Sequence, residues 1–343
     1  MSPQDLGNKK VAVLYTSVEE SLAGVADETM RETMDLAVSA RFVTEGLNGS
    51  GVTARSFTFG KDIVALAESF RSYGADAVFN LSECPMNSAQ KEPHGAAYLE
   101  LLRFPYTGNG PMALSVCNNK ALTKRILASH GIATPGFRVF SEVPREGCWL
   151  PFPVIVKPSK EDGSAGITEE SIVEDEAGLA ERVAHVIEKY AQEALVEEFV
   201  DGREFNVAVL GNGTPEDPFR TFPPAELVYR NPRWRICSFE SKWDPGHPSY
   251  AEIAPQCPAG VSDELRAGLT LLTIECARVF GLCGYSRVDF RTDGNGKLFV
   301  LEVNPNPDIS PDAGLARAAR AGGLSYKALI LEILRLGLAR GVR

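Results

Sequence analysis

Four polar residues near the C-terminal end of the chain have the types and the spacing of a magnesium site. Arg287 and Asp289 alternate along one β-rich run, and the apolar run that follows it carries Glu302 and, two positions on, Asn304. The turn between the runs reads DGNG, which is typical of a β-hairpin. Because side chains two positions apart on a strand share a face, the hairpin is expected to gather all four. Two carboxylates and an amide oxygen suit Mg²⁺, and Mn²⁺ accepts the same ligands.

Arg287 adds a positive charge next to this expected metal site. A guanidinium in that position is suited to hold phosphoryl oxygens and to stabilise negative charge that develops during a reaction. The alternative interpretation is a surface hairpin with solvated charges. It is disfavoured because residues 299–303, FVLEV, are apolar enough to be buried, and buried carboxylates need partners.

Two lysines and a loop that contains glycine form a second group. Lys157 ends the apolar run PVIVKP, and Lys120 lies in the helical pattern NNKALTKR. The loop EDGSAG, residues 161–166, follows Lys157, and its glycines allow backbone N–H groups and the hydroxyl of Ser164 to approach a phosphate. The loop lacks the G-K-[ST] sequence of a P-loop, so by itself it is weak evidence for a nucleotide site.

A third group lies in the segment ALVEEFVDGREF. Glu197, Phe199 and Val200 are expected on an edge strand beside a purine, where backbone groups recognise the base. Glu204 lies beyond them, and its carboxylate is able to accept ribose hydroxyls. Read without the other two groups, these acidic residues would be interpreted as a solvated face.

The elements that must position these groups alternate between β and α patterns, which predicts an α/β fold with a parallel sheet in its first third. Expected strands occupy residues 10–15, 53–57, 77–81, 153–158, 194–199 and 205–211, followed by the two strands of the hairpin. Expected helices include residues 63–73, 95–102, 113–130, 177–191, 262–280 and 326–340. Residues 214–259 are rich in proline and aromatic residues, and we expect long irregular loops over a site there.

Length and composition restrict the class of protein. A chain of 343 residues exceeds the size of one hydrophobic core, so two or three subdomains are expected. The formal net charge of −10 disfavours nucleic acid as a partner. No apolar run reaches the roughly 18 residues of a membrane span, and the start of the chain is too short for a signal segment, so we predict a cytoplasmic protein. The seven cysteines include no C-x-x-C pair, which disfavours a zinc ribbon and a disulfide framework.

The motifs, taken in order, resemble the ATP-grasp superfamily and, within it, the D-alanine:D-alanine ligase group. They are VFNLSE, LELLRFPYTGNG, NNKALTKRILASHGIATP, PVIVKPSKEDGSAG, ALVEEFVDGREF, ESKW, GYSRVDF and LEVNPNP, and they span most of the chain. The resemblance implies an N-terminal parallel α/β domain over residues 1–116, followed by the central and C-terminal ATP-grasp subdomains over residues 117–205 and 206–343, with ATP bound between the last two. It also implies a homodimer.

The resemblance implies a role for each candidate residue. ATP phosphates would contact Lys120, Lys157 and the loop with Ser164, and Lys242 would lie near the γ-phosphate. The adenine edge would be Glu197, Phe199 and Val200, with Glu204 on the ribose. The metal ligands would be Asp289, Glu302 and Asn304, and Arg287 would face an acyl phosphate. The implied reaction joins a substrate carboxylate to the amine of a second small molecule and yields an amide, ADP and phosphate.

Departures from the family pattern fall in the substrate subsites. Gly163 and Trp243 stand where the ligases have a serine and a tyrosine that support a glutamate of the first loop, for which Glu19 or Glu20 would serve here. Asp308 replaces a glycine next to the reaction centre, and Ala313 replaces a serine that binds the second D-alanine. The sequence therefore leaves three alternatives to a D-alanine ligase. They are a ligase for other amino acids or small peptides, a non-catalytic ATP-binding module and a phosphotransferase.

Overall fold

The first third of the chain forms a parallel sheet, as predicted. The computed structural model describes residues 6–16, 27–145, 147–230, 235–244 and 246–341. The strands are β1 (Lys10–Tyr15), β2 (Thr53–Thr58) and β3 (Ala77–Leu81), in the order β2-β1-β3. Helices α2 (Asp27–Asn48) and α3 (Ile63–Tyr73) connect them. Asp62 caps α3 by accepting the backbone N–H groups of Val64 and Ala65.

The middle of the chain forms a four-stranded antiparallel sheet covered by one helix. Its strands are β4 (Phe137–Phe140), β5 (Val154–Pro158), β6 (Ile172–Val173) and β7 (Ala194–Glu198), in the order β4-β7-β5-β6, and the helix is α7 (Glu176–Tyr190). The prediction of an edge strand at Glu197 is wrong, because Glu197 pairs with Phe137 on one side and Ile155 on the other. The short strand β4, which the sequence did not indicate, takes the edge position.

The last part of the chain is built on a six-stranded sheet. Its strands are β8 (Glu204–Gly211), β9 (Arg220–Thr221), β10 (Ala225–Tyr229), β11 (Ile253–Gln256), β12 (Gly284–Thr292) and β13 (Leu298–Asn304). The order is β11-β10-β8-β12-β13, with β9 beside β8. Residues 214–259 are therefore not only irregular loops, since they contribute three of these strands and the helices α8 (Phe239–Trp243) and η4 (Pro248–Glu252).

The remaining helices lie between the strands and after the last strand. They are η1 (Pro85–Asn87), η2 (Ala89–Lys91), α4 (Glu92–Leu101), α5 (Pro111–Cys117), α6 (Lys120–Ser129), η3 (Glu169–Ser171), α9 (Asp263–Val279), α10 (Gly314–Ala321) and α11 (Tyr326–Arg340). The single helix expected over residues 113–130 is two helices. The break occurs at Asn119, whose side chain accepts the N–H of Leu122 and so caps the start of α6.

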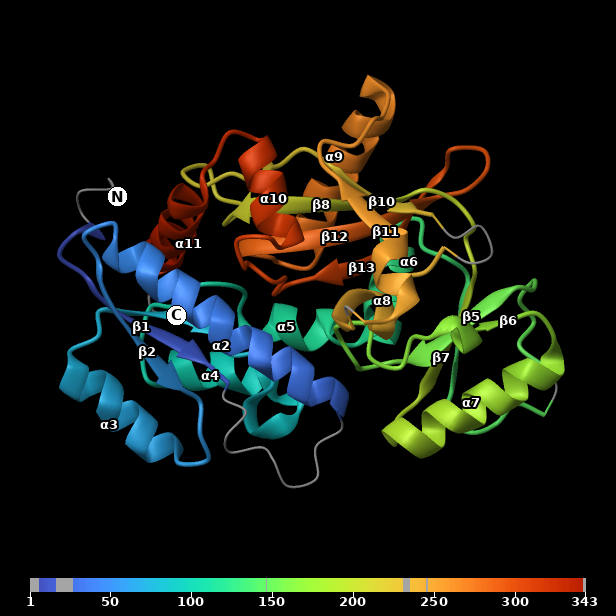
Figure 1. Ribbon diagram of the computed structural model, residues 1–343, viewed down its shortest axis with the longest axis horizontal. Helices are drawn as coiled ribbons and strands as arrows, with labels where there is room; N and C mark the ends of the chain where they lie inside the picture. The colour runs from blue at the N-terminus through green and yellow to red at the C-terminus, as the bar shows by residue number, and fades with distance from the viewer. Residues whose placement is uncertain (1–5, 17–26, 146, 231–234, 245, 342–343) are drawn as a thin grey trace.

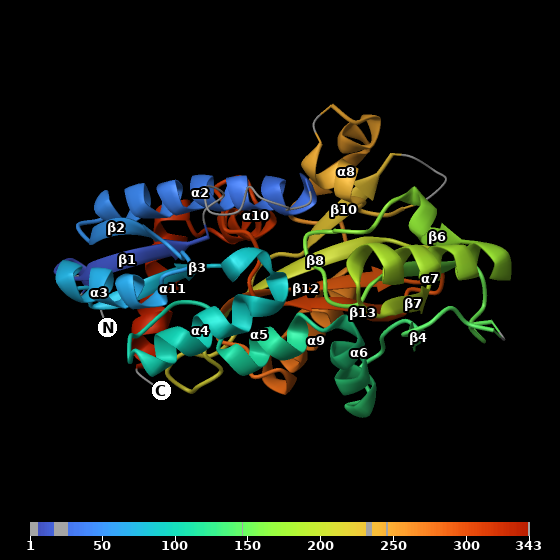
Figure 2. The same cartoon turned by 90° about the horizontal axis from the view of Figure 1, so that it is seen from below.

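The three sheets lie side by side along the molecule. Figure 1 shows the four-stranded sheet with α7 at one end, the parallel sheet with α2 and α3 at the other, and the six-stranded sheet between them. In Figure 2, α4, α5 and α6 follow one another along one side. One hydrophobic core contains Val11 and Phe79 of the parallel sheet together with Leu329 and Ile333 of α11, so the two ends of the chain are packed against each other.

Candidate active site

The predicted hairpin forms and brings its polar residues together. In the antiparallel pair of β12 and β13, Asp289 lies opposite Glu302, and Arg287 lies opposite Asn304. The register shifts between Asp289 and Phe290, where the pair has an irregularity of the β-bulge type. The sequence-based prediction that these residues gather on one hairpin is therefore confirmed.

Arg287 and Asp289 form a bidentate ion pair at the centre of the hairpin. The Nε of Arg287 donates to Oδ1 of Asp289 at 2.7 Å, and its second amino group donates to Oδ2 at 2.8 Å. Asn206, opposite Asp289 on β8, donates to the same Oδ1 at 2.7 Å. Burial raises the pKa of Asp289 above its ordinary value, although Arg287 opposes this effect.

Glu302 lies among three cationic side chains. It forms an ion pair with Lys120, the first residue of α6. Burial disfavours its ionised form, but the charges of Lys120, Lys157 and Arg287 outweigh burial and lower the pKa of Glu302 to about 2. The start of α6 is fixed beside β5, because the N–H of Lys120 donates to the carbonyl of Ser159 at 2.9 Å. Glu302 on β13 therefore interacts with the charge of Lys157, which belongs to the central sheet.

A second carboxylate, that of Glu197 on β7, also contacts two lysines. Lys124 and Lys157 both form ion pairs with it, and Glu197 and Lys124 are almost completely buried. Burial, with the nearby charge of Lys120, lowers the pKa of Lys157 to about 8. Lys124 was missed in the sequence, although its position one helical turn after Lys120 is a signal that places both on the same face of α6.

The loop of residues 161–166 requires its glycines. Gly166 has φ +75°, and a Cβ there would lie 2.6 Å from Cγ of Pro158. Arg182, a buried residue of α7 that the sequence analysis missed, donates to the carbonyl of Gly166 at 2.9 Å. The N–H of Phe239 in α8 donates to the carbonyl of Ile167 at 2.9 Å. The loop is thus held by the helix that covers its own sheet and by the helix that carries Lys242.

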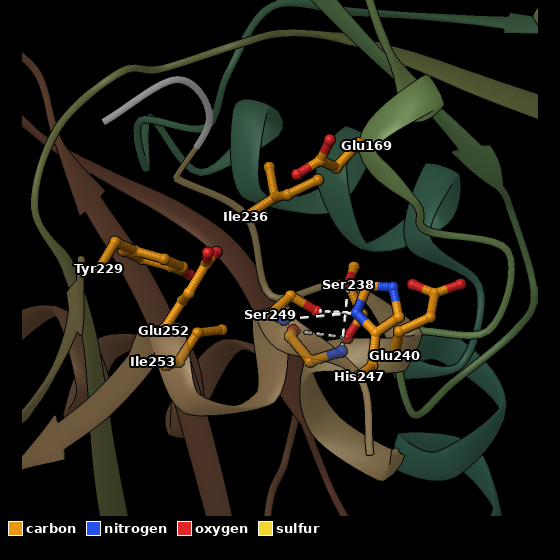
Figure 3. Close-up of a pocket in the computed structure, with 10 residues that line it drawn as sticks. Glu169, Tyr229, Ile236, Ser238, Glu240, His247, Ser249, Glu252 and Ile253 are labelled. Atoms are coloured by element: carbon orange, nitrogen blue, oxygen red, sulfur yellow. Dashed lines mark hydrogen bonds between the residues drawn. The ribbon is translucent and has the colours of Figure 1, made fainter. Parts of the chain in front are cut away.

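Lys242 and Ser164 both interact with the thiol of Cys237. Burial raises the pKa of Cys237, while the charge of the exposed Lys242 and a hydrogen bond with Ser164 lower it. Beside them is a cavity of about 40 Å³, which Figure 3 shows between Tyr229 and the residues of α8 and η4. His247 lines this cavity and its Nδ1 lies 2.7 Å from the hydroxyl of Ser249. Ser164 and Lys242 are therefore both neighbours of Cys237.

The residues proposed for the nucleoside lie where β7 ends and β8 begins. Phe199 and Val200 follow β7 outside any strand, and Glu204 is the first residue of β8. The hydroxyl of Tyr229 donates to Glu204 at 2.7 Å, and Arg291 donates to the same carboxylate. Arg291 was missed, although the alternation that placed Arg287 and Asp289 on one face of β12 also places Arg291 there.

A further buried carboxyl group, Glu92, supports the loop after the hairpin. Its two oxygens accept hydrogen bonds from the side-chain amides of Asn118 at 2.5 Å and Asn306 at 2.7 Å. The N–H of Asn306 in turn donates to the side-chain oxygen of Asn304 at 2.9 Å. Burial raises the pKa of Glu92 to about 8. Nothing in the sequence around Glu92 distinguishes it from an ordinary acidic residue in the first turn of a helix.

The positions that depart from the family pattern have local roles. Asp308 is exposed, and its Oδ1 accepts both the N–H and the hydroxyl of Ser310 at 2.8 Å. Ala313 is the N-cap residue of α10 and provides no side-chain cap. Gly163 has φ +60°. Glu19, Glu20 and the side chain of Trp243 lie outside the part of the chain that the structure describes.

Comparison with known proteins identifies the family. The model of the D-ala D-ala ligase C-terminus matches residues 130–335. The D-alanine–D-alanine ligase of Bordetella petrii is 32% identical over 301 residues, which are 87% of this chain and 86% of the relative. This chain belongs to the D-alanine–D-alanine ligase family. An uncharacterized protein of Sinorhizobium fredii is also similar, with 34% identity over 75% of this chain and 73% of its own length.

The fold of the family is confirmed by solved structures. The D-alanine–D-alanine ligase of Bacillus anthracis, in a crystal structure with ATP, matches with a TM-score of 0.74 and 18% identity over 97% of this chain and 98% of its own length. The predicted ATP-grasp fold is therefore correct. As a member of the family the chain is an ATP-dependent ligase that forms carbon–nitrogen bonds. Among the described helices, none has the length and the apolar character needed to cross a membrane.

Proposed function

We propose that this ligase uses Mg-ATP to join the carboxylate of one amino acid or small peptide to the amine of another. The observation that carries the proposal is the position of Glu302, whose ionisation is controlled by Lys120, Lys157 and Arg287. These cations come from two different sheets and a helix, and they surround the place where a polyphosphate and a metal would meet.

ATP phosphates would replace carboxylates as the partners of the lysines. Lys120 and Lys157 now pair with Glu302 and Glu197, and Lys120 also interacts electrostatically with Asp162 in the loop of Ser164, so a phosphate chain would contact the lysines and this loop. Lys242, on α8, would approach the γ-phosphate. Glu197 would act indirectly by orienting Lys157, because its carboxylate is committed to lysines and its backbone pairs within the sheet.

The nucleoside would lie at the junction of β7 and β8. Phe199 and Val200 follow β7 outside any strand, and the N–H of Phe199 donates to the carbonyl of Pro153 at 3.1 Å, which holds the segment next to β5. The purine edge would lie against this segment. Glu204 would accept the ribose hydroxyls. Glu204 is 8% exposed, so water solvates it only in part.

Asp289, Glu302 and Asn304 fit a magnesium ion by the chemistry of their donor atoms. They supply two carboxylates and one amide oxygen from adjoining strands, and they include neither imidazole nor thiolate. The carboxylate of Glu302 is paired with Lys120, which a metal would replace, and the carboxylate of Asp289 is paired with Arg287. A bound Mg²⁺, or Mn²⁺, would neutralise charge on the phosphates during transfer.

The residues of the chain would then act on two successive steps. An oxygen of the first substrate's carboxylate attacks the γ-phosphorus, the bond to ADP breaks, and an acyl phosphate forms. The nitrogen of the second substrate attacks the acyl carbon, inorganic phosphate leaves, and the nitrogen loses a proton. Arg287, already anchored by Asp289, would hold the phosphoryl oxygens in both steps. Positioning and charge neutralisation account for the chemistry without a covalent nucleophile.

The identity of the two substrates depends on the altered subsites. Relatives named as D-alanine–D-alanine ligases make D-alanine the first candidate. Asp308 and Ala313 provide a carboxylate and a methyl group where that reaction uses a glycine and a serine, so another amino acid or small peptide is the second candidate. A cytoplasmic location and a homodimer remain predictions from the sequence.

The experiment is a search for ATP-dependent condensation products by mass spectrometry. The full chain is incubated with Mg-ATP and pooled L- and D-amino acids and dipeptides. We expect one amide product and one ADP for each turnover. ADP release without any condensed product would favour phosphotransfer instead. No product and no phosphate above background would overturn the ligase proposal.

A further inference from the structure

Arg291, which belongs to none of the family motifs, contacts each segment proposed to hold the nucleoside. It donates to the carbonyl of Val200 at 3.0 Å, and its Nε and one amino group donate to Oε2 of Glu204 at 2.9 and 2.7 Å. Its guanidinium lies 5.1 Å from the centre of the Phe199 ring. The side chain is almost completely buried. Arg291 is therefore the group that joins the proposed base edge to the proposed ribose contact.

The sheet explains why Arg291 reaches these partners. Arg291 on β12 lies opposite Glu204 on β8, and Asp289 lies opposite Asn206 two residues along the same pair of strands. Side chains two positions apart share a face, so Arg291 projects on the same side as Asp289. One face of β12 thus carries both the proposed metal end and the proposed nucleoside end of the site.

The ion pair between Arg291 and Glu204 leaves one carboxylate oxygen of Glu204 available. Arg291 donates twice to Oε2, and the hydroxyl of Tyr229 donates to the same atom at 2.7 Å. Oε1 accepts no hydrogen bond from any residue in the described ranges. A carboxylate has acceptor capacity on both oxygens, and the two hydroxyls of a ribose are donors of the matching kind. Oε1 is therefore the atom through which Glu204 would accept a sugar hydroxyl.

We infer that Arg291 is a positioning residue of the nucleotide site. It fixes Glu204 through Oε2, so that Oε1 is presented to the ribose, and it holds Phe199 and Val200 beside the base. The inference rests on the proposed nucleotide site. It goes beyond that proposal because it assigns sugar recognition to an ion pair rather than to Glu204 alone.

The test measures how strongly the full chain distinguishes ATP from 2′-deoxy-ATP and 3′-deoxy-ATP. Dissociation constants are measured by calorimetry with Mg²⁺ and without amino-acid substrates. Because a hydrogen bond to a charged acceptor is lost, we expect at least one deoxynucleotide to bind the wild-type chain about tenfold or more weakly than ATP. Arg291→Lys keeps the charge but lacks the bidentate geometry, so the ratio should fall to about threefold or less. Glu204→Gln should reduce it similarly.

A matched control is available directly before β8. Arg203 also forms a bidentate pair with a carboxylate, that of Glu226, and lies 5.0 Å from the ring of Phe205. Arg203→Met should leave the ratio of dissociation constants unchanged. Thermal unfolding of each variant shows whether it is folded, and Tyr229→Phe, which removes only a hydroxyl, provides a milder test of the same carboxylate.

The possible results are distinct. A variant at Arg291 that is folded, binds ATP and retains the wild-type ratio would overturn the inference while leaving the proposed function intact. The same holds if the wild-type chain binds the three nucleotides equally. A wild-type chain that binds no ATP would overturn the proposed function, and the inference with it. A reduced ratio with Arg291→Lys, together with an unchanged ratio for Arg203→Met, would support it.

Discussion

Lys120 and Glu302 form an ion pair between the first turn of α6 and strand β13, 182 positions apart in the chain. One partner is the proposed phosphate lysine and the other a proposed metal ligand. A phosphate that binds Lys120 leaves Glu302 without its counter-charge, and a cation that binds Glu302 releases Lys120. Each ligand therefore removes an obstacle to binding of the other.

We predict that Mg²⁺ and ATP bind cooperatively. ATP affinity should rise by about tenfold or more when Mg²⁺ replaces a chelator, and Mg²⁺ alone should bind weakly because Glu302 is already paired. Calorimetry with and without each partner measures the coupling. Glu302→Gln should remove most of it, and equal ATP affinity with Mg²⁺ and with chelator in the wild-type chain would contradict the account.

Glu302→Gln should also abolish turnover. The amide cannot replace the charge that holds a metal and balances Lys120 and Arg287, so we expect kcat to fall by at least about a hundredfold. The measurement is ADP release coupled to product formation. Glu264→Gln, on the exposed side of α9, is the control and should have wild-type activity.

ATP binding should weaken as pH rises through about 8. Burial lowers the pKa of Lys157 to about 8, below that of an unfolded lysine, so the folded protein loses this charge in a range where lysine is ordinarily protonated. We expect roughly a tenfold rise in the dissociation constant for ATP between pH 7 and pH 9. Lys157→Arg stays charged, so its profile should be flatter. Identical profiles would refute the role of Lys157.

Glu92 should make the stability of the protein depend on pH. Its pKa is raised from 4.5 to about 8, so the folded state binds a proton that the unfolded state has released between these values. The contribution of Glu92 to stability is then complete below pH 4.5 and is lost as pH rises through about 8. Urea unfolding at pH 6 and pH 9 should show a larger decline for wild type than for Glu92→Gln, and parallel declines would count against this pKa.

Strand alternation and turn chemistry were sufficient to predict the hairpin of Asp289 and Glu302. The same alternation placed Arg291 on that face of the strand. The role of Arg291, however, depends on its contact with Glu204, which lies 87 positions earlier. Glu92 depends in the same way on Asn306, 214 positions away. Local patterns specify which face a side chain occupies, whereas its partner is decided by packing between distant segments. The edge position of β4 was missed for the same reason.

The most direct test of the proposed chemistry follows an oxygen atom. The carboxylate of the first substrate, D-alanine or the amino acid identified by the condensation search, is labelled with ¹⁸O and the reaction is run with Mg-ATP and the second substrate. If an acyl phosphate forms, one labelled oxygen passes to inorganic phosphate for each amide made. Amide formation with unlabelled phosphate would contradict the account, because it would show that the carboxylate never attacks the γ-phosphorus.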